Sequence, residues 1–151
     1  MLAVRGIGLI LFLAALVPLE AAAALGGPAS SVAADQAHMK AMREEKAGSA
    51  YTVHEITTPS GTMVREFVSS ATGQVFAVTW QGPFMPDLRQ VLGDHFATLV
   101  DATGKERIGR SNAVVNRPEV VIHSGGHMRA FAGKAYLPGQ LPEGVSVEDI
   151  R

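Results

Sequence analysis

Three short runs in the middle of the chain alternate between apolar and polar residues. They cover residues 51–57, 62–68 and 74–80 and are rich in Val, Thr, Phe and Tyr. A period of two with these residue types predicts β-strands. The two connecting segments hold turn residues and are too short for a crossover, so the strands must pair as an antiparallel meander. The third run is apolar at nearly every position, which predicts a central strand covered on both faces.

A helical period replaces the alternation after Pro83 and Pro86, which exclude both strand and helix from that corner. Asp87 follows as a candidate N-cap. Apolar residues then recur at helical spacing, which predicts one amphipathic helix from Asp87 to about Val100. Its stripe is formed by Leu88, Val91, Leu92, Phe96, Leu99 and Val100. Gly93 interrupts the stripe at a cost of about 1 kcal/mol relative to alanine.

A second β pattern fills the C-terminal third. It predicts a weak strand over 113–115 and a hairpin from 120–123 and 127–136, with a two-residue turn at Gly125-Gly126, because both glycines accept a positive φ. The fold class that follows is α+β: a small antiparallel sheet of about five strands, a meander plus the C-terminal hairpin, with one amphipathic helix packed on it.

The register of this hairpin determines whether His123 and His127 can bind one metal ion together. A turn at Gly125-Gly126 sets His123 and His127 on opposite faces, with Arg129 and Phe131 on the side of His127. Two histidines that point apart cannot share an ion, so we expect no metal and no other cofactor. A three-residue loop would bring the two rings side by side, and a metal or small-ligand site at His123 and His127 is therefore the alternative.

The first 24 residues have the pattern of a cleaved signal peptide. Arg5 supplies a positive charge, residues 6–17 form an uncharged apolar segment, and Ala22 and Ala24 provide the small residues that signal peptidase requires. A membrane anchor is the alternative, but a spanning helix needs about 20 apolar residues and this segment closes earlier. We expect an exported protein, periplasmic or secreted, with no stable membrane span after cleavage.

The remaining chain divides into two parts by composition. Residues 25–50 are expected to be a flexible linker with a short helix over 36–47, because the first of them are rich in Gly, Ala, Ser and Pro. Residues 51–151 are expected to form a single α+β domain.

Charge and cysteine content exclude several classes of function. The chain has 13 basic and 14 acidic residues, and this balance argues against a nucleic-acid binder, which needs a basic surface. It has no cysteine, which excludes disulfides, thiolate zinc sites and a cysteine nucleophile. A hydrolase would have to recruit Ser124 or Ser60 with His127 and Asp94. Neither serine lies in a Gly-x-Ser-x-Gly motif, so we expect no catalytic residues.

The proline corner is the most distinctive apolar feature. Trp80, Phe84 and Met85 lie beside two prolines and a glycine, which gives a rigid corner able to bind a ligand or a partner. With His127 and Arg129 of the hairpin they are the candidate binding residues. The structural alternative is that Trp80 closes the end of the core against the helix.

Four separated blocks of this sequence match a known family in order: TPSGTMVREFV, FAVTWQGPFMPDLRQVLGDHF, HSGGHMRAFAGKAYLP and LPEGVSVEDIR. The chain resembles, over roughly residues 25–151, an exported proteobacterial family catalogued as domain of unknown function 2844. The resemblance implies export and a single domain. It brings no activity, ligand or catalytic residue.

We therefore predict a non-enzymatic exported binding or interaction module of the cell envelope, with another envelope protein as its partner. A metal or small-ligand binder that uses the hairpin histidines and a hydrolase are the alternatives. The sequence leaves the identity of the ligand and the oligomeric state open.

Overall fold

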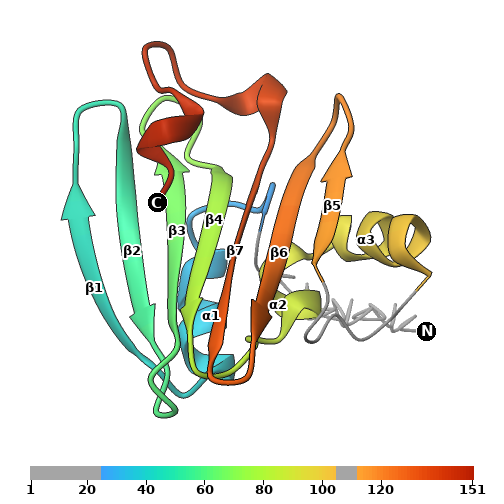
Figure 1. Ribbon diagram of the computed structural model, residues 1–151. Helices are drawn as coiled ribbons and strands as arrows, with labels where there is room; N and C mark the ends of the chain where they lie inside the picture. The colour runs from blue at the N-terminus through green and yellow to red at the C-terminus, as the bar shows by residue number, and fades with distance from the viewer. Residues whose placement is uncertain (1–24, 105–111) are drawn as a thin grey trace, which may run out of the picture.

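The protein is built around one seven-stranded antiparallel sheet, where the sequence predicted about five strands. The computed structural model describes residues 25–104 and 112–151. The strand order is β1-β2-β3-β4-β7-β6-β5. Three short α-helices lie behind this sheet and the C-terminal tail crosses in front of it (Figure 1). We call these the helix face and the outer face. No helix in the described part of the chain is long and apolar enough to cross a membrane.

The predicted meander is confirmed. It consists of β2 (Tyr51–Thr57), β3 (Met63–Ser69) and β4 (Val75–Gly82), which pair as antiparallel neighbours. β4 is the middle strand of the sheet, and its first six residues are buried. The apolar residues of this strand are therefore covered by other parts of the protein on both faces of the sheet.

The N-terminal segment corrects two expectations. The structure places a helix, α1 (Ser31–His38), earlier than predicted, and residues 42–47 form a strand, β1 (Met42–Ala47), which pairs with β2. The helix predicted over 36–47 is wrong, because sheet pairing overrides the helix propensity of this polar segment. Leu25 and Val32 belong to the main core, so residues 25–50 are part of the packed domain rather than a linker ahead of it.

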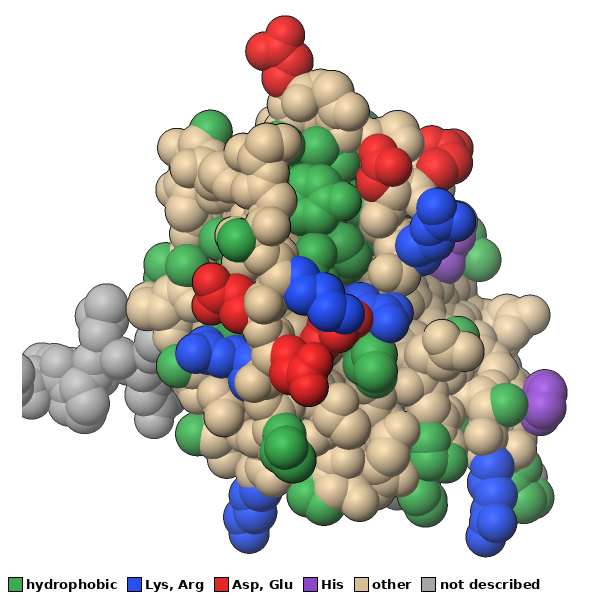
Figure 2. Space-filling model, turned by 90° about the vertical axis from the view of Figure 1, so that its left-hand side faces the viewer, with side chains coloured by type: hydrophobic (Ala, Val, Ile, Leu, Met, Phe, Trp, Pro, Cys, Tyr) green, Lys and Arg blue, Asp and Glu red, His purple; other side chains and the backbone are tan. Residues whose placement is uncertain are grey.

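β1 is an edge strand with all six residues exposed, four of them charged. Figure 2 views the molecule from the left-hand side of Figure 1, where β1 lies, and shows acidic and basic side chains gathered in the centre of this view. Mixed charge on an edge strand opposes pairing with another chain.

The second half of the sheet contains β5 (Ala113–Asn116), β6 (Val121–His127) and β7 (Ala130–Tyr136). His127 pairs with Ala130, so Met128 and Arg129 form the turn and the predicted turn at Gly125-Gly126 is wrong. The two glycines lie inside β6. A Cβ on Gly126 would come 2.7 Å from the Phe131 Cα, so the absence of a side chain at Gly126 allows β6 and β7 to approach closely.

The correct register also changes the faces of the hairpin. Gly126 lies opposite Phe131, so Phe131 does not share the face of His127. The expectation that His123 and His127 lie on opposite faces is also wrong, because both belong to β6 and residues four apart on a strand share a face. They are about 13 Å apart along the strand, which is too far for both to bind one ion.

The predicted helix after the proline corner is divided into α2 (Leu88–Leu92) and α3 (His95–Thr103). Asp87 caps α2 as expected, because its side chain accepts hydrogen bonds from the amides of Arg89 and Gln90. Gly93 has a φ of 53° and ends α2, so the apolar stripe continues on two helices rather than one.

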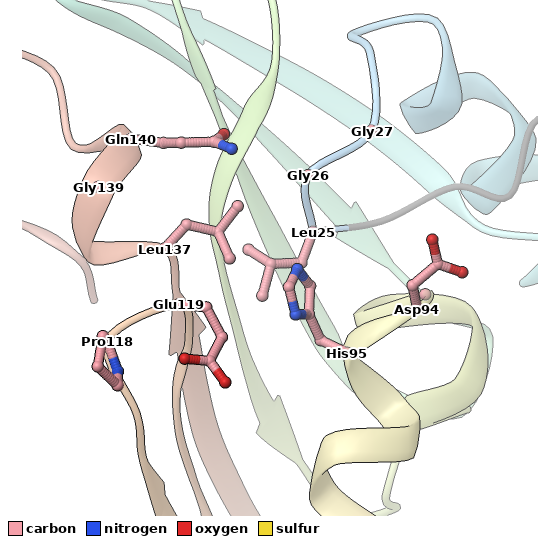
Figure 3. Close-up of a pocket in the computed structure, with 11 residues that line it drawn as sticks. Leu25, Gly26, Gly27, Asp94, His95, Pro118, Glu119, Leu137, Gly139 and Gln140 are labelled. Carbon is pink, nitrogen blue, oxygen red and sulfur yellow. The ribbon is translucent and has the colours of Figure 1, made fainter.

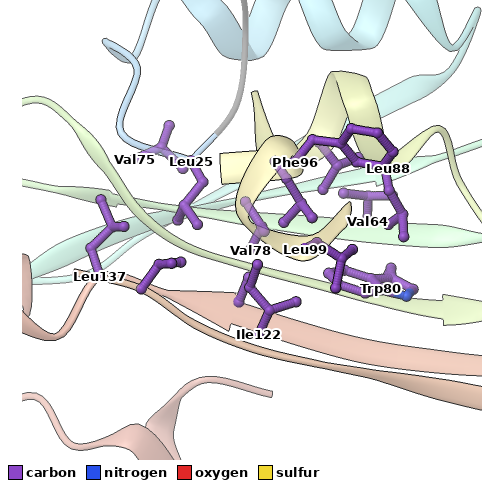
Figure 4. Close-up of a cluster of buried hydrophobic side chains, with 14 of the residues drawn as sticks. Leu25, Val64, Val75, Val78, Trp80, Leu88, Phe96, Leu99, Ile122 and Leu137 are labelled. Carbon is purple, nitrogen blue, oxygen red and sulfur yellow. The ribbon is translucent and has the colours of Figure 1, made fainter. Parts of the chain in front are cut away.

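Two hydrophobic clusters lie on opposite faces of the sheet. The larger one fills the helix face and includes Trp80, Leu88, Leu99 and Ile122 (Figure 4). The smaller one lies on the outer face, where Phe67 and Phe76 pack under Ile150. The tail that brings Ile150 there carries two 3₁₀ turns, η1 (Pro138–Gln140) and η2 (Val147–Asp149).

Candidate functional site

The structure separates the predicted binding residues of the proline corner. Trp80 is only 2% exposed and belongs to the same cluster as Leu88, Leu92 and Phe96. Its indole lies across Gly133, whose missing side chain leaves the space for the ring. Trp80 is therefore a core residue, in agreement with the alternative that it closes the end of the core against the helix.

Phe84 is the exposed member of this corner, with 56% of its surface accessible. Its backbone is nevertheless fixed, because the hydroxyl of buried Thr62 donates to the Phe84 carbonyl at 2.8 Å and accepts from its amide at 3.3 Å. Met85 is partly buried against the core. The corner thus presents one aromatic ring to solvent from a fixed backbone.

His127 and Arg129 are exposed at the tip of the β6–β7 hairpin. Arg129 has a positive φ of 63°, which the tight turn imposes. No group of three or more potential metal ligands occurs within residues 25–104 and 112–151. Asp94 lies near the turn before β6 and His127 at the end of that strand, about 20 Å away, so they do not assemble with Ser124 or Ser60.

A cavity of about 580 Å³ opens at the other end of the sheet (Figure 3). Four segments that are distant in sequence form its walls. They are residues 25–27, residues 93–95 between α2 and α3, Pro118 and Glu119 before β6, and Leu137, Gly139 and Gln140 after β7. This volume suits a small ligand. We call this cavity the glycine-walled pocket, because four of its residues are glycine.

Backbone hydrogen bonds attach the first wall of the glycine-walled pocket to the fold. The Gly26 amide donates to the Val75 carbonyl at 2.8 Å, and the Val75 amide donates to the Gly27 carbonyl at 2.8 Å. The Leu25 amide donates to the carbonyl of Val91 at 3.3 Å. Gly26 has a φ of 90°, which favours glycine at this position. The wall is a fixed part of the domain.

His95 and Glu119 supply the polar chemistry of the glycine-walled pocket. Burial lowers the pKa of His95, and the carboxylates of Asp94 and Glu119 oppose this shift only in part. The imidazole is therefore neutral at pH 7. Figure 3 shows it beside Leu25 with the Glu119 carboxylate across the space, while the Asp94 carboxylate points away from the ring. None of the lining residues is Lys or Arg, so the charged lining is acidic.

Sequence reasoning missed this pocket because no one segment carries it. The sequence offers Asp94 only as a candidate hydrolase residue, with His127 and either Ser124 or Ser60. The one local signal was Leu25, an apolar residue directly before two glycines.

A second set of titratable groups is buried where α1 meets the helix face of the sheet. Glu66 of β3 is 0% exposed, Asp35 of α1 is also fully buried, and the Gln90 amide donates to Asp35. Burial first, and the neighbouring Asp35 carboxyl second, raise the pKa of Glu66 to about 9. Burial also raises the pKa of Asp35. The Glu66 carboxyl is therefore protonated at pH 7, so the buried pair does not carry two negative charges.

A comparison with family models matches residues 21–150 to the family described as Protein of unknown function (DUF2844). The chain belongs to this family. No curated protein and no solved structure matches the chain. The family match extends over the walls of the glycine-walled pocket and over the C-terminal tail to residue 150, so both belong to the domain that the family shares.

Proposed function

We propose that this member of the family is a non-enzymatic exported binding module of the cell envelope, and that it binds a small amine-bearing ligand in the glycine-walled pocket. The observation that supports this function is the convergence of a neutral imidazole and a carboxylate on a half-open cavity of about 580 Å³. The pocket combines these polar groups with the apolar side chains of Leu25 and Leu137. Sites for small molecules have this composition.

Binding is favoured over covalent catalysis by the types of side chain that line the pocket. Among its lining residues there is no hydroxyl, thiol or amine side chain to act as a nucleophile beside His95. The Glu119 carboxylate would pair with a cationic amine, and the neutral imidazole would accept a hydrogen bond from it. Phe84, at the opposite end of the sheet, gives the module a contact point for an envelope protein partner.

Putrescine, a small diamine, tests this proposal against 1,4-butanediol, which has the same length and no charge. We expect putrescine to shift the NMR amide signals of the pocket glycines, Gly26, Gly27, Gly93 and Gly139, in protein purified after export. Glu119→Gln should weaken the binding at least tenfold, because it removes the charge that faces the ligand. The exposed Glu143→Gln variant is the control and should bind normally. Equal shifts with the diol, or unchanged binding by Glu119→Gln, would contradict the proposal.

Export is a separate part of the proposal with its own expected result. Signal peptidase requires small residues one and three positions before the cut, so cleavage after Ala24 should give a mature chain that starts at Leu25. This cut leaves the complete first wall of the glycine-walled pocket on the mature protein. Intact-mass measurement of the exported protein checks the position. A membrane-bound protein that still carries residues 1–24 would overturn the export proposal.

A further inference from the structure

The outer face of the sheet holds a second cavity, distinct from the glycine-walled pocket. It has a volume of about 530 Å³ and lies over β4, β7 and β6, next to the C-terminal residues Ile150 and Arg151. We call it the outer groove. The glycine-walled pocket and the buried carboxyl pair lie outside it, and of the proline corner only Trp80 contributes to its lining.

The strand register places a row of polar side chains along the floor of the outer groove. Arg65 pairs with Thr79, Thr79 with Lys134, and Lys134 with His123, so all four residues occupy neighbouring strands on one face. Neighbouring strands are about 4.8 Å apart, and the row therefore extends over roughly 14 Å. This length matches an elongated small molecule rather than a single-atom ion.

The charged side chains that line the outer groove are all basic: Arg65, Lys134 and Arg151. Arg65 is held in place from outside the groove, because its Nε donates to Glu55 at 2.7 Å. Lys134 forms no ion pair within 4 Å in the described part of the chain. Its ammonium group is therefore available to a ligand.

The nearby acidic residues do not close the outer groove to anions. Glu148 and Asp149 lie on η2, and neither lines the groove. Asp149 is already engaged, because it accepts hydrogen bonds from the Ser146 amide at 2.8 Å and from its hydroxyl at 3.0 Å. Glu148 is fully exposed, and its carboxylate interacts with the Lys134 ammonium group only through their opposite charges.

We propose that the outer groove binds a small oxyanion with two or more charged groups, either a polycarboxylate or a phosphate compound. Arginine and lysine at separate places in the row would each take one charged group, and the Thr79 hydroxyl and the His123 ring would add hydrogen bonds between them. This site is independent of the ligand proposed for the glycine-walled pocket.

Citrate and inorganic pyrophosphate, which each carry two or more charged groups, are the probes that test the outer groove. Isothermal titration at constant ionic strength should show saturable one-to-one binding of at least one of them, and the stronger of the two identifies the preferred class. Lys134→Gln should weaken this binding at least tenfold. Lys40→Gln removes the same charge from an exposed turn outside the groove and is the matched control.

A second variant tests the outer groove without changing Lys134, in case Lys134→Gln changes the fold. Ala132 is exposed on the groove floor, and Ala132→Glu should abolish binding by repulsion while the melting temperature stays within a few degrees of the parent value. Absence of binding by both probes, or equal losses in Lys134→Gln and Lys40→Gln, would overturn the proposal. The latter result would indicate general charge screening rather than a site.

Discussion

Trp80→Ala is expected to lower the free energy of unfolding by about 3 to 5 kcal/mol, the usual cost of a large-to-small change in a protein core. The indole is 2% exposed and packs in the main cluster under α2 and α3. Urea denaturation followed by far-UV circular dichroism measures the change. Phe84→Ala is the control from the same corner, and it should cost less than about 1 kcal/mol because the ring is exposed. A loss below 1 kcal/mol for Trp80→Ala would instead make Trp80 a surface residue.

The contact between Trp80 and Gly133 can be tested separately. A Cβ on Gly133 would lie within the van der Waals radius of the Trp80 ring, so Gly133→Ala should destabilise the parent protein. The cost should be smaller when Trp80 is already alanine, because the ring that causes the clash is gone. A double-mutant cycle measures this coupling. Additive effects would mean that the two residues do not contact each other.

The parts of the fold that the sequence predicted correctly depend on short-range rules. The meander follows from alternation and short turns, and Asp87 caps α2 because an acidic side chain precedes a free helix end. β1 could not be recognised in this way, since its residues favour a helix and only pairing with β2 makes them a strand. Gly125 and Gly126 satisfy the rules for a turn equally well, but the strands continue through them.

The candidate site was less predictable than the fold, because it depends on contacts between distant segments. Exposure of Phe84 and burial of Trp80 are opposite outcomes for two apolar residues of one corner, because Trp80 lies within β4 and faces the main core while Phe84 lies beyond the end of this strand. The glycine-walled pocket requires residues 25–27 to pair with β4, which composition alone argued against. The outer groove requires the register of four strands.

The buried carboxyl pair leads to the last expected result, a stability that falls as the pH rises from 7 to 9. The pKa of Glu66 is about 9 in the folded protein, against an ordinary value of 4.5 for an unfolded chain. Between these two values the folded state binds one more proton than the unfolded state. Stability from this group is therefore complete below pH 4.5 and is lost as the pH rises through 9, with a slope of up to about 1.4 kcal/mol per pH unit.

Other charged or titratable groups lie around the pair. His38 of α1 lies 3.4 Å from Asp87, and Arg43 and Glu45 of β1 face the same region. Burial lowers the pKa of His54 on β2 below its ordinary 6.5. This histidine therefore makes stability increase as the pH rises through that lower range, and it is neutral above about pH 7.5. Urea denaturation between pH 7.5 and 9 therefore isolates the carboxyl pair.

Glu66→Gln should remove the slope, because glutamine keeps the shape of the side chain and has no titrating proton to lose. We expect this variant to be more stable than the parent at pH 9 and the difference to shrink toward pH 7.5. Glu143→Gln makes the same change in charge on the surface and should keep the parent slope. Parallel stability curves for the parent and Glu66→Gln would show that Glu66 is already ionised at pH 7.5. In that case α1 would pack against a buried negative charge on Glu66.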